Sequence, residues 1–165
     1  MGDWHDFFLA QAGAAGVLTG LVFVGVSINL QKIVSNPSSG LAGRAAEALI
    51  LLVAVLLASV LVLVPGQGPG VLGAEVLVVG LAAWGWILAI QLRRLRDWRT
   101  MSADLRGPFV LRVVLSQVAT LTLVIAGVAL LWVGPGGLYW LMAGTIFSIL
   151  AALSEAWVLL VEINR

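Results

Sequence analysis

Long runs of apolar residues, separated by short polar or Pro-Gly segments, make up most of the sequence. A hydrocarbon core about 30 Å thick is crossed by about 20 residues of α-helix, so runs of this length predict membrane spans. We predict an all-α, integral membrane bundle of five transmembrane helices that forms a single transmembrane domain over residues 1–165. The approximate spans are Phe7–Gln31, Leu41–Val64, Val71–Leu92, Phe109–Val133 and Leu138–Glu162.

Two connections between the predicted spans are rich in proline and glycine. They read PGQGPG (Pro65–Gly70) and GPGG (Gly134–Gly137). Because such runs end helices and form turns, they favour two tight hairpins over a four-span alternative that would merge helices across them. No Lys or Arg precedes the first apolar run, so we expect the first span to be retained rather than cleaved as a signal peptide.

Composition supports a membrane protein. Hydrophobic residues make up 61% of the chain and charged residues 10%, and the mean hydropathy is +1.10. Soluble domains have about 25% charged residues, and a water-soluble fold of this length could not bury so much apolar surface. The lipid bilayer is therefore an expected partner. The chain has no cysteine, which excludes disulfides, thiolate metal sites and cysteine nucleophiles.

The basic residues predict the orientation of the helices. All lie in or beside the first connection, the third connection or the C-terminus, which five spans place on one side of the membrane. The positive-inside rule then predicts an N-terminus outside and a cytoplasmic C-terminus, as in a bacterial inner (plasma) membrane. The nine are Lys32, Arg44, Arg93, Arg94, Arg96, Arg99, Arg106, Arg112 and Arg165.

The first span is rich in small residues. Its segment QAGAAGVLTGLVFVGVSINL, residues 11–30, repeats them at four-residue and seven-residue intervals, which places them on one side of a helix. The expected contact face consists of Ala12, Gly13, Gly16, Gly20 and Ser27. Such a face serves either packing within one subunit or a contact between subunits, including a pore-lining one. We expect a homo-oligomer, with another membrane protein as a possible partner.

Glu155 lies inside the last apolar run, where an ionised group is unfavourable in lipid. Equal rise along the two helices of the last hairpin puts it level with Gln117 and one turn from Arg112, so an Arg112–Glu155 pair is possible. The same estimate predicts a polar layer in the cytoplasmic third of the bilayer. Its members are Ser27, Asn29, Glu47, Gln91, Arg112, Gln117 and Glu155. The layer either ties the helices together or lines a path for ions, protons or a polar substrate.

The remaining candidate sites carry less chemistry. Four arginines, Arg93, Arg94, Arg96 and Arg99, follow the third span and are expected at lipid headgroups rather than at nucleic acid. One histidine, His5, cannot support a Ser-His-Asp triad inside the membrane, and we predict no catalytic residues, no metal site and no cofactor.

These patterns favour a non-enzymatic membrane protein. The leading hypothesis is a small oligomeric channel or transporter component, with Glu47, Arg112 and Glu155 near the polar pathway. The alternative is a non-transporting accessory or assembly protein that binds another membrane protein through the Gly-rich first helix.

Overall fold

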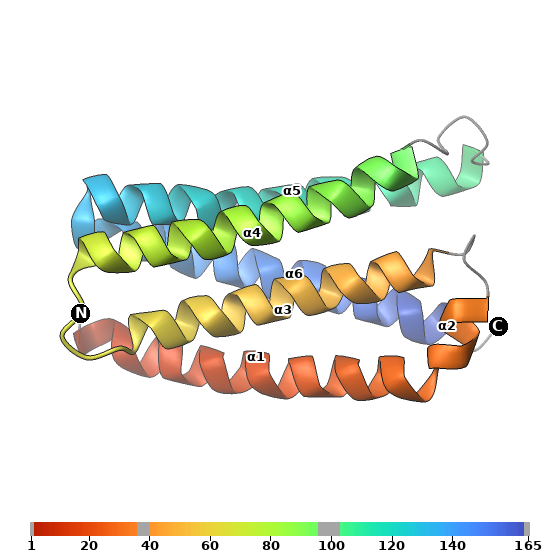
Figure 1. The fold of residues 1–165 in the computed structure, drawn as a ribbon, viewed down its shortest axis with the longest axis horizontal. Coiled ribbons are helices and arrows are strands. Elements are labelled where there is room, and N and C mark those ends of the chain that lie inside the picture. The colour runs from red at the N-terminus through yellow and green to blue at the C-terminus, as the bar shows by residue number, and fades with distance from the viewer. Residues whose placement is uncertain (1, 36–39, 96–102, 164–165) are drawn as a thin grey trace. The chain divides into compact units, whose positions relative to one another are not determined.

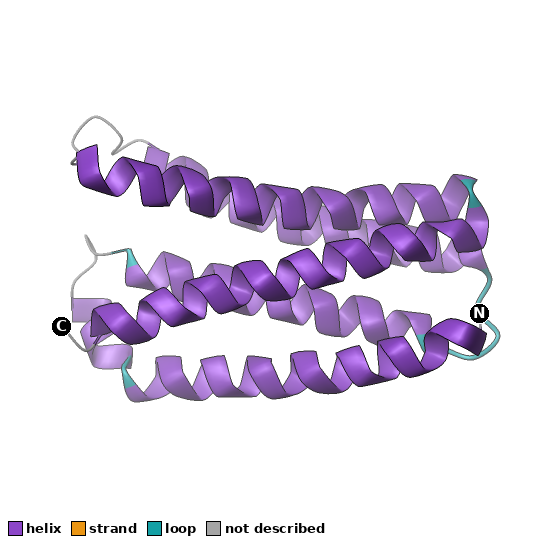
Figure 2. Cartoon of the chain, turned by 180° about the vertical axis from the view of Figure 1, so that it is seen from behind, coloured by secondary structure: helices purple, strands orange, loops and turns teal. Residues whose placement is uncertain are grey.

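A computed structural model describes residues 2–35, 40–95 and 103–163. Within these ranges the chain is helical and has no β-strand (Figures 1 and 2). The elements are α1 (Gly2–Ile28), α2 (Leu30–Ser35), α3 (Leu41–Val62), α4 (Pro69–Leu95), α5 (Ala103–Trp132), the 3₁₀ turn η2 (Gly134–Gly136) and α6 (Gly137–Ile163).

Five of these helices are long and apolar enough to cross a membrane, which confirms the five predicted spans. They are α1, α3, α4, α5 and α6. By length and composition, these helices are compatible with a multi-pass membrane protein. Its two Pro-Gly runs separate helices as predicted, and Pro69 opens α4, where its missing N–H removes no helical hydrogen bond.

The first span ends earlier than the sequence predicted. The α-helix stops at Ile28 rather than Gln31, and the short helix α2 follows it. The Asn29 side chain donates a hydrogen bond through Nδ2 to the Gly25 carbonyl at 2.9 Å, so it competes for the acceptor that a continuing helix would use. The result is a break that the apolar pattern does not reveal.

Contacts between Cα atoms divide the chain into two compact units. The first unit comprises Met1–Gly68 and Ile149–Arg165. In it α1 and α3 lie side by side and run in opposite directions (Figure 1). Near α2, the buried side chains of Ile33, Leu41, Ala45 and Leu159 form an apolar cluster that joins α2, α3 and the end of α6.

The second unit, Pro69–Ser148, contains α4, α5, η2 and the beginning of α6. Its helices approach one another at glycines. A Cβ atom at Gly127 of α5 would lie 2.6 Å from the Leu77 nitrogen of α4, and one at Gly137 would lie 2.5 Å from the Leu130 nitrogen. Backbone atoms occupy the space that any larger side chain would need, so glycine is required at both positions. Gly73, Gly80 and Gly144 lie in similarly close contacts within this unit.

Candidate functional site: buried polar clusters and an exposed helix face

Glu155 is part of an ion pair inside the first unit. Its side chain is 4% exposed, and its Oε2 accepts a hydrogen bond from Arg44 Nη1 of α3 at 3.4 Å. The sequence predicts a role for Arg44 only as one of the basic residues that set the orientation. The signal that could have identified it is its place inside an apolar helix, one turn before the buried Glu47.

Glu47 and Arg112 are buried in separate units. Glu47 is 0% exposed on α3 in the first unit, and Arg112 is 4% exposed on α5 in the second. Arg112 is accompanied by Ser116, whose hydroxyl donates to the Arg112 carbonyl at 3.0 Å. Both charged side chains are therefore buried, and their grouping in one polar layer stays a prediction.

The second polar cluster, after the Arg44–Glu155 ion pair, consists of Gln91, Gln117 and Trp84. Gln117 Nε2 donates to Gln91 Oε1 at 2.8 Å, and Trp84 Nε1 donates to Gln117 Oε1 at 2.8 Å. The chain of hydrogen bonds links α4 to α5 inside the second unit. The pairing of Gln91 with Gln117 groups two members of the predicted layer. The sequence did not identify Trp84 as a hydrogen-bond donor, because nothing in its local pattern distinguishes it from the exposed Trp86.

Ser27 and Asn29 direct their polar groups to their own helix. The Ser27 hydroxyl donates to the Phe23 carbonyl at 2.8 Å, and Asn29 bonds to Gly25 in the same way. Backbone carbonyls four residues earlier thus satisfy these donors in an apolar environment. Among the described residues, neither side chain forms a hydrogen bond to another helix.

Within the first unit, the described helices cover only part of the small-residue face of α1. Gly13, Gly20 and Ser27 are exposed, and a Cβ atom at Gly13 or Gly20 would meet nothing within 4 Å. Ala12 and Gly16 are half-buried, and a Cβ at Gly16 would lie 4.0 Å from Leu56 of α3. The expected face therefore divides into an inner edge beside α3 and an outer strip at Gly13, Gly20 and Ser27.

Of the arginines expected at lipid headgroups, Arg93 and Arg94 form the last turn of α4. There they complement the negative end of the helix dipole as well as any anionic surface. Arg96 and Arg99 lie outside the described residues.

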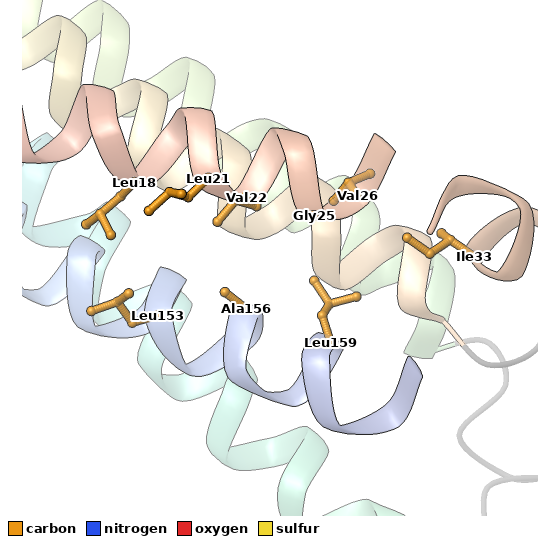
Figure 3. Close-up of a pocket in the computed structure, with 9 residues that line it drawn as sticks. All are labelled: Leu18, Leu21, Val22, Gly25, Val26, Ile33, Leu153, Ala156 and Leu159. Carbon is orange, nitrogen blue, oxygen red and sulfur yellow. The ribbon is translucent and has the colours of Figure 1, made fainter. Parts of the chain in front are cut away.

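An apolar groove is present that the sequence did not reveal (Figure 3). It lies in the first unit between α1 and the last turns of α6, and α2 contributes one residue near its end. The groove has a volume of about 210 Å³. Its lining consists of Leu18, Leu21, Val22, Gly25, Val26, Ile33, Leu153, Ala156 and Leu159.

No protein-family model matches the sequence, and the searches of characterised proteins and of solved structures found no match either. Among the described side chains, no three His, Asp or Glu residues lie close enough together to hold a metal ion.

Proposed function

We propose that this chain is a non-enzymatic assembly protein of the membrane that binds a second transmembrane helix through the outer strip of α1. The observation that carries the proposal is the exposure of Gly13, Gly20 and Ser27, with open space where a Cβ of either glycine would lie. Glycine within a helix costs about 1 kcal/mol relative to alanine, so lipid contact alone does not favour it.

The contacts of other glycines in the chain support the proposed helix contact. Gly73, Gly127 and Gly137 each lie against the backbone of a neighbouring helix or turn within the second unit. The outer strip offers the same kind of surface, with glycines seven residues apart, but no described helix of the first unit covers it. A helix from a second copy or from another membrane protein supplies the matching surface.

The channel or transporter hypothesis has less support. The Arg44 guanidinium accompanies Glu155, amide and indole groups pair with one another around Gln117, and the groove is lined by apolar residues. Polar groups that satisfy one another stabilise a bundle, whereas a permeation path needs groups that can replace an ion's hydration shell. Flux through the purified protein in liposomes tests this alternative directly.

Orientation is part of the proposal. We place the N-terminus outside and the C-terminus in the cytoplasm of a bacterial-type inner membrane, because the basic residues gather on one side. Arg93 and Arg94, at the end of α4, then lie at the anionic cytoplasmic surface.

Disulfide cross-linking tests the contact, since the chain has no cysteine of its own. Ser27→Cys places a single thiol on the outer strip, and oxidation in native membranes should give a discrete cross-linked product. A product with the mass of two chains identifies a second copy, and one of another fixed mass identifies a different membrane protein. Ser154→Cys is the matched control, because Ser154 is also an exposed serine but lies on α6.

A second variant separates contact from reactivity. Gly20→Leu in the Ser27→Cys background should abolish the product, because leucine prevents close approach of the backbones. Gly85→Leu should leave it unchanged, since Gly85 is another exposed glycine with open space around it but lies on α4. Equal cross-linking of Ser27→Cys and Ser154→Cys, or persistence of the product with Gly20→Leu, would refute the proposed contact. Ion flux from liposomes that depends on Glu155 would instead favour a channel.

A further inference from the structure

The apolar groove has buried residues at one end and exposed residues farther along. Ile33 and Leu159, which are 3% and 4% exposed, line the end beside α2. Leu21 and Leu153, which are 64% and 41% exposed, line the rest of the groove from α1 and α6. Figure 3 shows side chains from α1 above and from α6 below directed into the space between the helices.

Small residues on both walls create the space. Gly25 lies on α1, Ala156 lies on α6, and a Cβ atom at Gly25 would meet nothing within 4 Å. The groove lies within the membrane-spanning parts of both helices, so hydrocarbon is the solvent at its mouth. An empty groove would leave its walls without dispersion contacts, which favours an apolar occupant. An engineered apolar cavity of about 150 Å³ is already large enough to bind benzene.

The surroundings of the groove favour an alkyl chain as its occupant. The space of about 210 Å³ lies between the apolar side chains of two helices. A flexible alkyl chain can follow such a space, and the bilayer supplies these chains at high local concentration.

A basic residue neighbours the groove in the sequence. Lys32 is exposed on α2 and is next to Ile33, which lines the end of the groove beside α2. It is the only lysine in the sequence. An acyl chain in the groove would bring its headgroup toward α2, where a cation favours an anionic phosphate. Because lipid and groove are equally apolar, selection among lipids has to come from this charge.

We propose that the groove between α1 and α6 binds one acyl chain of an anionic phospholipid, with the headgroup at Lys32. This site goes beyond the proposed assembly function and does not depend on it. Gly20 of the outer strip and Val22 of the groove are two positions apart on α1, so they point to opposite sides of the helix.

Lipid retention tests the site. The full chain is reconstituted in phosphatidylcholine vesicles that contain phosphatidylglycerol, extracted in mild detergent, and examined by native mass spectrometry for bound phospholipid. The unmodified chain should retain phosphatidylglycerol in preference to phosphatidylcholine. Ala156→Phe fills the groove from α6 and should cause a several-fold loss of the retained lipid. Gly25→Leu fills it from α1, and provides a second filling variant if the first fails to fold.

Two further variants separate the acyl chain from the headgroup. Ala82→Phe makes the same change at an exposed alanine of α4 and should leave retention unchanged. Lys32→Gln should remove the preference for phosphatidylglycerol while phosphatidylcholine is still retained. Retention at the unmodified level in folded Ala156→Phe and Gly25→Leu overturns the groove as the site, and an undiminished preference in Lys32→Gln overturns the headgroup assignment. Absence of retained lipid from the unmodified chain, with a dimer that Ala156→Phe disrupts, would assign the groove to a second copy.

Discussion

Arg44 and Glu155 lie 111 positions apart in the sequence, and the Arg44 Nη1 atom is 3.4 Å from Glu155 Oε2. The pair joins α3 to the second half of α6 within the first unit. Both side chains are largely shielded, with exposed fractions of 15% and 4%. Removing one charge from such a pair leaves the other poorly compensated, whereas removing both avoids that penalty.

A double-mutant cycle should therefore show coupling between these two residues. Glu155→Gln and Arg44→Gln should each destabilise the protein, and the double variant should be less destabilised than the sum, with a coupling energy of about 0.5–3 kcal/mol. The measurement is the free energy of unfolding in detergent micelles. Pairing Arg44→Gln with Ser154→Ala, at an exposed neighbour on α6, should give additive effects. Additive effects for Arg44 and Glu155 would mean that the pair contributes little to the fold.

Gln117 should be the most sensitive member of the second polar cluster. Gln117→Leu removes the acceptor of Trp84 Nε1 and the donor to Gln91 Oε1, so it disrupts two hydrogen bonds at once. Interhelical hydrogen bonds in membranes contribute about 0.6 kcal/mol each on average and about 1.7 kcal/mol at most, so we expect a loss of about 1–3 kcal/mol.

Unfolding in micelles checks this prediction against a matched control. Thr122→Val removes a hydroxyl of the same helix that donates to the Val118 carbonyl on an exposed surface. This control should change the unfolding free energy by less than Gln117→Leu does. Equal effects of the two variants would indicate that the cluster adds nothing beyond ordinary helix hydrogen bonding.

Glycine-to-alanine changes should have opposite signs at two positions. Gly127→Ala introduces a Cβ that would lie 2.6 Å from the Leu77 nitrogen and should destabilise the protein by about 1–3 kcal/mol, because backbone atoms cannot move aside cheaply. Gly85→Ala meets nothing within 4 Å and should stabilise α4 by up to about 1 kcal/mol through helix propensity. Thermal unfolding of the two variants checks the contrast, and a Gly127→Ala protein as stable as Gly85→Ala would contradict the close packing of α4 on α5.

Single-cysteine labelling should establish the orientation. Gly68→Cys lies in the connection between α3 and α4 and should react with a membrane-impermeant maleimide from outside intact cells. Ser35→Cys, at the end of α2, should react only after the membrane is permeabilised. The reverse pattern would invert the proposed topology.

The five spanning helices could be predicted because length and apolarity alone determine whether a helix can cross a membrane. Side-chain partners could not, because they depend on which helices pack together and at what rotation. Glu155 was recognised as unusual from its surroundings in the sequence, yet its partner Arg44 belongs to a helix far away along the chain. The arrangement of Gln117 between Trp84 and Gln91 depends on helix packing in the same way.

The sequence predicts the packing role of the glycines only in part. The small residues of α1 are dense in the sequence, but Gly13 and Gly20 have open space around them. Gly73 and Gly80 of α4, and Gly137 and Gly144 of α6, also repeat at seven residues and lie in close contacts. Spacing could have identified them, although it cannot say whether the neighbour belongs to the same chain.

The connection between α5 and α6 bears on how the protein is made. A single 3₁₀ turn, Gly134–Gly136, joins the two helices, and Gly137 already lies against the backbone of Leu130. Because the link is so short, α5 cannot span the bilayer fully while the beginning of α6 is still on the other side. We therefore expect the two helices to leave the ribosome and enter the lipid as one hairpin, so that their insertion is a single event.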